Sequence, residues 1–205
     1  MAAPLVICFG DSLTAGYQSP TRACPTVCET PYGEVLQAKF GAEAQVVVSG
    51  ICGELTGEMA LRFRTAVLDR HPHTVVILGG TNDLGWNAAP QEIMRNLLKM
   101  YEQARSAGIR PVPVTVPSLR PAGEITGVEG QAFLQDHVDR RHALNRLIQD
   151  YARSHDLPCV DLFTATAEAG TSWLAEPYSN DGLHLTTAGY RRFGELVYDA
   201  IAPLS

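Results

Sequence analysis

The chain has 205 residues, enough for one compact domain, and its 45% hydrophobic and 19% charged residues exclude an intrinsically disordered protein. The net charge of −6, with no run of lysines and arginines, argues against binding nucleic acid through bulk charge. No apolar stretch approaches the roughly 20 residues of a membrane-spanning helix. The first residues lack the basic segment of a signal peptide, so we expect a cytoplasmic protein.

Short aliphatic runs alternate with longer helical patterns along the whole chain. Five runs are predicted to be buried strands, at residues 5–9, 45–48, 74–78, 111–116 and 159–162. Pro111 and Pro113 indicate that at least one backbone side of the fourth strand is unpaired, because proline has no amide hydrogen to donate. The alternation predicts one domain over residues 1–205, a three-layer α/β/α sandwich with about five parallel strands.

Four longer segments have the periodicity of amphipathic helices. The first follows Gly57, with Met59 and Phe63 on its apolar face, and the second begins at Pro90 and ends before Gly108. The other two span about residues 130–155 and 187–202. These helices are expected to cover both faces of the sheet.

Ligands of open parallel sheets bind beyond the carboxyl ends of the strands, so polar residues there are the first candidates for chemistry. Ser12 follows the first strand, and a serine hydroxyl becomes a good nucleophile only beside a base. His184 can be that base. Asp181, three residues earlier, can reach the other imidazole nitrogen, fix its tautomer and stabilise the imidazolium. The pattern predicts a catalytic triad of Ser12, Asp181 and His184 for acyl transfer.

Acyl transfer also needs hydrogen-bond donors for the developing oxyanion. The candidates are the backbone N–H of Ser12, the backbone N–H of Gly53 and the side-chain amide of Asn82. Gly50 is an alternative to Gly53. Asp83 is expected to hold the loop that carries Asn82.

These residues fall into four blocks that resemble the GDSL esterase/lipase group of the SGNH hydrolases. The blocks are residues 10–13 (Gly-Asp-Ser-Leu), Gly53, residues 80–83 (Gly-Thr-Asn-Asp) and residues 181–184 (Asp-Gly-Leu-His). The resemblance spans nearly the whole chain and implies a flavodoxin-like sheet, ester hydrolysis through an acyl-serine, and neither metal nor other cofactor.

The chain departs from the family pattern at two places. Family members often have Gly-Asp-Thr at the second block, where this chain has Gly53 followed by Glu54. Residues 19–30 form a longer segment than compact relatives need, and it is expected to influence substrate choice because loops at this face shape the pocket.

Three further residues are predicted to line the substrate pocket: Trp86, Tyr17 and Cys52. Cys52 is also the alternative nucleophile if Ser12 is not used. Cys24 and Cys28 could form a disulfide or half of a zinc site, but no nearby pair of cysteines or histidines completes the latter. The five cysteines, odd in number and irregular in spacing, do not form a disulfide framework.

The sequence therefore predicts a serine esterase whose partner is a small ester, and short acyl chains are favoured because no obvious lid segment of an interfacial lipase is present. Alternatives with the same triad are a carbohydrate O-deacetylase, a thioesterase or lysophospholipase, and an acyltransferase. A non-catalytic binding domain is a further alternative from a different class. A flavin or nucleotide module is disfavoured because the chain has no glycine-rich phosphate-binding loop after a strand.

Overall fold

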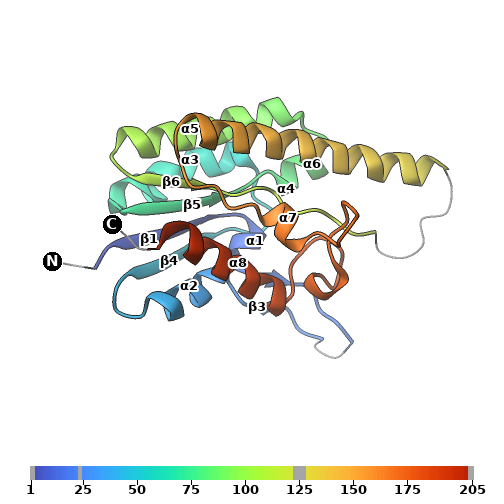
Figure 1. Cartoon of the computed structure of the whole chain (residues 1–205), viewed down its shortest axis with the longest axis horizontal. Helices are drawn as coiled ribbons and strands as arrows, with labels where there is room; N and C mark the ends of the chain where they lie inside the picture. Colours follow the sequence, from blue (N-terminus) through green and yellow to red (C-terminus); the bar gives the residue numbers. More distant parts are fainter. Residues whose placement is uncertain (1–2, 23–24, 122–127, 203–205) are drawn as a thin grey trace.

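A computed structural model describes residues 3–22, 25–121 and 128–202. Its centre is a parallel sheet in the order β4–β1–β5–β6 (Figure 1). The strands are β1 (Leu5–Gly10), β4 (Gln45–Gly50), β5 (Thr74–Leu78) and β6 (Arg110–Pro113). Because β1 pairs in parallel with both β4 and β5, the carboxyl ends of all three meet at one edge of the sheet.

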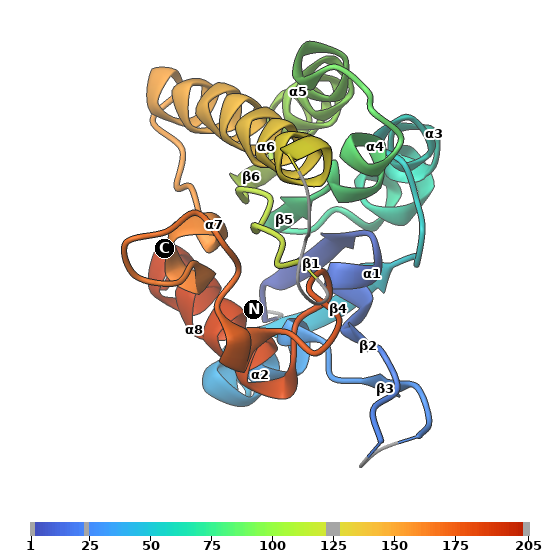
Figure 2. The same cartoon turned by 90° about the vertical axis from the view of Figure 1, so that its right-hand side faces the viewer.

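Helices cover the two faces of the sheet, which gives the predicted three layers. Helices α2 (Tyr32–Phe40) and α8 (Thr187–Ile201) cover one face, and α3 (Thr56–Ala66), α5 (Pro90–Ser106) and α6 (Val128–Ser154) cover the other (Figures 1 and 2). Alternate residues of β1 divide between the two cores, as the twofold period of a strand requires. Val6 and Cys8 pack toward α2 and α8, whereas Ile7 and Phe9 pack toward the other helices.

The predicted fifth strand is wrong in extent. Val160 makes a single parallel bridge to Val114, and its amide donates to the carbonyl of Pro113. Pro111 and Pro113 face this side and have no amide hydrogens, so the ladder cannot extend back along β6. On the other side, Asp161 caps the short helix α7 (Leu162–Thr166) and ends the extended segment.

Several short elements were not predicted. They are α1 (Ser12–Ala15), α4 (Thr81–Gly85), the 3₁₀ turns at Leu68–Arg70 and Glu176–Tyr178, and helix α2. The long segment after the first block forms a hairpin of β2 (Tyr17–Gln18) and β3 (Cys28–Glu29). Cys24 lies outside the described residues. Among the residues described, no helix has both the length and the apolar character needed to cross a membrane.

Candidate active site

Ser12 lies at the first turn after β1. The side chain of Asp11 accepts a hydrogen bond from the amide of Leu13 at 2.9 Å and so caps α1, which begins at Ser12. The helix is only four residues long and ends at Gly16, whose φ of 83° is easily adopted only by glycine. This sharp turn places the Ser12 hydroxyl at the carboxyl edge of the sheet.

Asp181 and His184 are joined by a tight local turn. The Oδ1 atom of Asp181 accepts hydrogen bonds from the amides of Leu183 at 2.8 Å and His184 at 2.7 Å. Gly182 has a φ of 82°, and a Cβ there would lie 1.9 Å from the carbonyl oxygen of Arg120. Only glycine therefore fits at position 182, where the turn passes close to the loop after β6.

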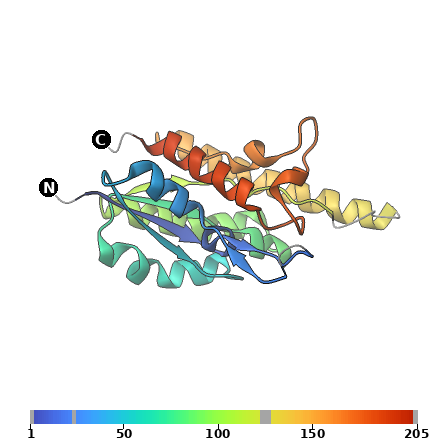
Figure 3. The same ribbon diagram turned by 90° about the horizontal axis from the view of Figure 1, so that it is seen from below.

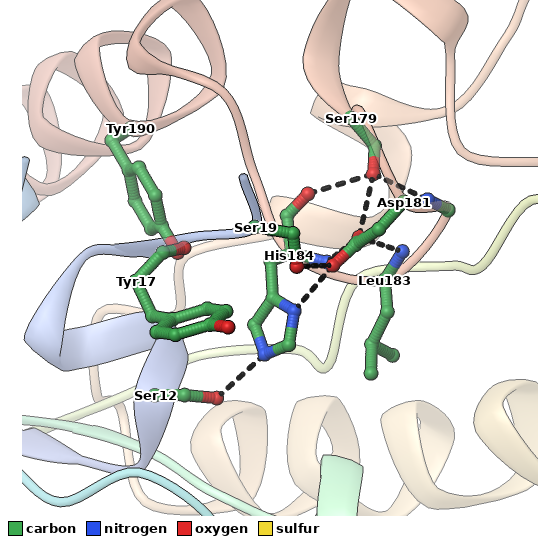
Figure 4. A network of polar contacts seen from close by, with 9 residues as sticks. Ser12, Tyr17, Ser19, Ser179, Asp181, Leu183, His184 and Tyr190 are labelled. Carbon is green, nitrogen blue, oxygen red and sulfur yellow. Dashed lines mark hydrogen bonds and ion pairs between the residues drawn. The ribbon is translucent and has the colours of Figure 1, made fainter. Parts of the chain in front are cut away.

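The turn aligns the imidazole with both partners. The Nδ1 atom of His184 lies 2.7 Å from Oδ2 of Asp181, and its Nε2 lies 3.2 Å from Oγ of Ser12 (Figure 4). A carboxylate accepts only, so Nδ1 carries the hydrogen and Nε2 presents a lone pair to the serine hydroxyl. The three predicted triad residues thus form one chain of hydrogen bonds across 172 positions of sequence.

The surroundings of Asp181 and Asp11 shift the pKa values of these two carboxyl groups in opposite directions. Partial burial opposes ionisation of Asp181, but hydrogen bonds from His184, Ser19 and two backbone amides hold the pKa of this carboxyl well below its ordinary value. Asp11 behaves in the opposite way: burial raises its pKa to about 7. Within the described part of the chain, its Oδ2 has no hydrogen-bond partner.

The predicted oxyanion donors lie beside the nucleophile. A cavity of about 410 Å³ is lined by Ser12, Gly53, Asn82, His184 and three further residues, Tyr17, Cys52 and Leu183. Gly53 has a φ of 78°, which glycine adopts most easily. A Cβ at this position would meet no other atom within 4 Å, so the backbone angle, and not a lack of space, accounts for glycine here. Among the described residues, the backbone amides of Ser12 and Gly53 donate to no other part of the chain.

Asn82 is held by the second block. Its Nδ2 donates one hydrogen to the carbonyl of Glu54 at 3.0 Å, which leaves the second amide hydrogen for a ligand. Asp83 accepts from the amide and hydroxyl of Thr56 at 3.0 and 2.6 Å, so it holds this loop to the start of α3.

An ion pair that the sequence analysis missed connects the segments carrying the donors. Arg62 on α3 binds both carboxylate oxygens of Glu54 at 2.6 Å. The same guanidinium donates to the Gly10 carbonyl at 3.1 Å and to the Ser49 hydroxyl at 2.8 Å, and it lies 4.2 Å from the centre of the Phe9 ring. An acid and a base eight residues apart, on a loop and a helix, give no usable signal in the sequence.

The predicted pocket residues lie in two places. Tyr17 and Cys52 line the cavity at the triad, and the Tyr17 ring centre is 4.6 Å from that of His184. Trp86 is 81% exposed and lines an adjoining cavity of about 510 Å³ instead. The two cavities share Asn82 and Leu183, so a substrate could span both.

The amino-terminal part of α6 forms one wall of the adjoining cavity. Phe133, Leu134 and His137 line it, and Figure 3 shows that the amino-terminal part of this helix extends past the sheet. No group of three or more His, Cys, Asp or Glu side chains in residues 3–22, 25–121 and 128–202 is arranged to hold a metal ion.

The chain is similar to known proteins over most of its length. The model of the GDSL-like lipase/acylhydrolase family matches residues 8–192. The chain is 27% identical to YqeF, an uncharacterized lipoprotein of Bacillus subtilis, over 96% of this chain and 87% of the relative. It is 24% identical to thioesterase 1/protease 1/lysophospholipase L1 of Escherichia coli, over 89% and 76% of the two chains.

The fold is shared with solved structures. Est24, a carbohydrate acetylesterase from Sinorhizobium meliloti, superimposes with a TM-score of 0.77 at 20% identity, covering 98% of this chain and all of that one. Since one of the relatives is named a lipoprotein, the cytoplasmic location inferred from the sequence stays a prediction.

Proposed function

Because the chain belongs to the GDSL-like lipase/acylhydrolase family, we propose that it is a serine esterase acting on short- to medium-chain carboxylic esters. The observation that carries the proposal is the hydrogen-bonded chain from Ser12 through His184 to Asp181, beside a cavity with three oxyanion donors. A nucleophile, an oriented base and preorganised donors are the parts that acyl transfer needs.

In the proposed mechanism, the Ser12 oxygen attacks the ester carbonyl while its proton passes to Nε2 of His184. Asp181 stabilises the imidazolium, and the amides of Ser12 and Gly53 with the Asn82 side chain bind the oxyanion. The imidazolium then gives its proton to the alcohol oxygen as the C–O bond breaks. Water, activated by His184, attacks the acyl-serine and releases the acid.

The two adjoining cavities support a substrate with one short and one larger part. The cavity at the triad, of about 410 Å³, is the smaller of the two, which suits a small acyl group. Trp86, Phe133 and Leu119 give the second cavity an apolar wall for the other part of the ester. Thioesters and sugar acetates, which the same chemistry would cleave, are the alternatives that a substrate panel separates.

The test is hydrolysis of para-nitrophenyl acetate, butyrate and octanoate by the wild type, Ser12→Ala and His184→Ala. We expect the two shorter esters to be the better substrates, and kcat to fall about 10⁴-fold or more in each variant. Ser106→Ala, at the exposed end of α5, is the matched control and should retain full activity.

Two results would contradict the proposal. Activity that survives in Ser12→Ala points to another nucleophile, with Cys52 in the same cavity as the first suspect. Ser12-dependent turnover of an acyl thioester or an acetylated sugar, without turnover of the para-nitrophenyl esters, would replace the assigned substrate class and keep the mechanism.

A further inference from the structure

The hairpin formed by β2 and β3 packs directly against the triad. The hydroxyl of Tyr190 on α8 donates to the Tyr17 carbonyl at 2.7 Å. The Gln18 side chain bonds Thr187 twice, donating to its hydroxyl at 3.0 Å and accepting from its amide at 3.1 Å. These contacts fasten the start of the hairpin to the first turns of the helix that follows His184.

This attachment brings the hydroxyl of Ser19 to the triad carboxylate. The Ser19 hydroxyl donates to Oδ2 of Asp181 at 2.5 Å, although the two residues are 162 positions apart. Pro20 follows Ser19 and restricts the Ser19 backbone to extended conformations, which limits the directions available to its side chain. Figure 4 shows Ser19 and His184 meeting the same carboxylate.

The choice of oxygen matters. Oδ1 of Asp181 already accepts two backbone amides and, at 3.3 Å, the Ser179 hydroxyl, which together fix the orientation of the carboxylate. Oδ2 is the oxygen that faces the imidazole, at 2.7 Å from Nδ1 of His184, and Ser19 donates to this oxygen. A donor on Oδ2 withdraws negative charge from the atom that stabilises an imidazolium, without being needed to hold it in place.

We propose that Ser19 is a positioning residue that acts on His184 through Asp181: by sharing Oδ2 it weakens the attraction of the carboxylate for the imidazolium and keeps the imidazole in its base form at lower pH. The role rests on the proposed esterase function, in which His184 must be unprotonated to accept the serine proton. In this proposal, the segment after the first block acts on the triad itself through Ser19, and not only through the shape of the pocket that the sequence predicts for it.

Other titratable or charged groups face the same pair and stay unchanged in the test. They are Tyr17 from the hairpin, Asp11 before α1, Cys52 from the loop after β4, Tyr190 from α8, and Arg120, His137 and Arg141, which line the adjoining cavity with Asp181. Because they are common to wild type and variants, a difference between the two reports the Ser19 hydroxyl.

The experiment compares Ser19→Ala with the wild type in two measurements. The first is the pH dependence of kcat/KM for para-nitrophenyl butyrate, whose acidic limb reports the free enzyme's base. The second is a ¹⁵N NMR titration of the His184 imidazole, which needs no turnover. We expect both midpoints to rise by roughly 0.5 to 1 pH unit in Ser19→Ala, the effect of losing one charge-assisted hydrogen bond. Plateau activity and KM should change only a few-fold.

Two further variants isolate the hydroxyl. Ser19→Thr keeps it on a side chain that suits extended backbone and should restore the wild-type midpoint. Thr30→Val removes the hydroxyl that accepts from Gln18 at 2.8 Å, which loosens the hairpin without touching Asp181, and should leave the midpoint unchanged.

The outcomes separate the two proposals. An unchanged midpoint in Ser19→Ala, or a uniform loss of activity at every pH, would overturn the role of Ser19 and leave the esterase assignment intact. Absence of Ser12-dependent esterase activity would overturn the proposed function, while the NMR titration would still decide whether Ser19 acts on His184.

Discussion

The ion pair between Glu54 and Arg62 gives the sharpest prediction for the oxyanion side of the site. Glu54 is 7% exposed, and Arg62 occupies both of its carboxylate oxygens at 2.6 Å. Arg62→Met keeps much of the packing on Phe9 but leaves a buried carboxylate unpaired, which typically costs about 3–5 kcal/mol. For a chain of this size the melting temperature should fall by roughly 6–20 °C.

Catalysis should also suffer, because one guanidinium holds three donor segments together. It binds the side chain of Glu54, which is the neighbour of Gly53 and whose backbone carbonyl accepts a hydrogen bond from Asn82. It also binds the carbonyl of Gly10, two residues before Ser12. We expect kcat to fall about 10²–10³-fold, the usual cost of losing one oxyanion donor, with KM changed only a few-fold.

The assay is a double-mutant cycle of Arg62→Met, Glu54→Gln and the pair, followed by urea denaturation and para-nitrophenyl butyrate kinetics. The double variant leaves no buried charge, so it should recover most of the stability but not the activity. Arg95→Met breaks an exposed pair with Glu92 and should cost less than about 1 kcal/mol. If Arg62→Met is no more destabilising than Arg95→Met, the reasoning fails.

Two other predictions concern single side chains. Asn82→Ala should lower kcat for para-nitrophenyl butyrate about 10²–10³-fold at nearly constant KM, and an unchanged kcat would remove Asn82 from the oxyanion site. Asp11→Asn tests the buried carboxyl, whose folded pKa of about 7 lies above the unfolded value. The stability given by its neutral form is complete below about pH 4 and is lost as pH rises to about 7. Between about pH 4 and 7, the free energy of unfolding of the variant, measured by urea denaturation, should therefore rise relative to that of the wild type by about 1.4 kcal/mol per pH unit. Parallel curves of unfolding free energy against pH would contradict the raised pKa.

Much of the site could be predicted because it depends on features that are local in sequence. The Asp181 turn is closed by hydrogen bonds to residues two and three positions later, so its spacing is written in four consecutive residues. Ser12 and Asn82 follow strands whose aliphatic runs are unmistakable, and parallel pairing brings such ends to one edge.

What could not be predicted depends on pairing between distant segments. Helix α2 begins Tyr-Gly, a weak helical start with no side-chain cap from Pro31 before it, and is secured by burial of Tyr32 and Leu36 under α8. Each strand of the hairpin has only two residues, too few to show the alternation of apolar and polar residues by which a strand is predicted. The predicted length of the fifth strand is too great, because the structure has only a single bridge there. The two prolines of β6 already indicated this limit, since they lack the amide hydrogens that a longer ladder with the fifth strand would need.

The two sides of the candidate site are built by different means, and the difference explains which mutations should matter where. On the oxyanion side, donors from three strand ends are held by one partly buried guanidinium, so a change at Arg62 should affect stability and kcat together. On the triad side, backbone amides already fix the Asp181 carboxylate, so in the proposed role the hairpin hydroxyl adjusts the charge on one oxygen without holding it in place. Changes at Ser19 should therefore move the pH profile and leave the fold intact.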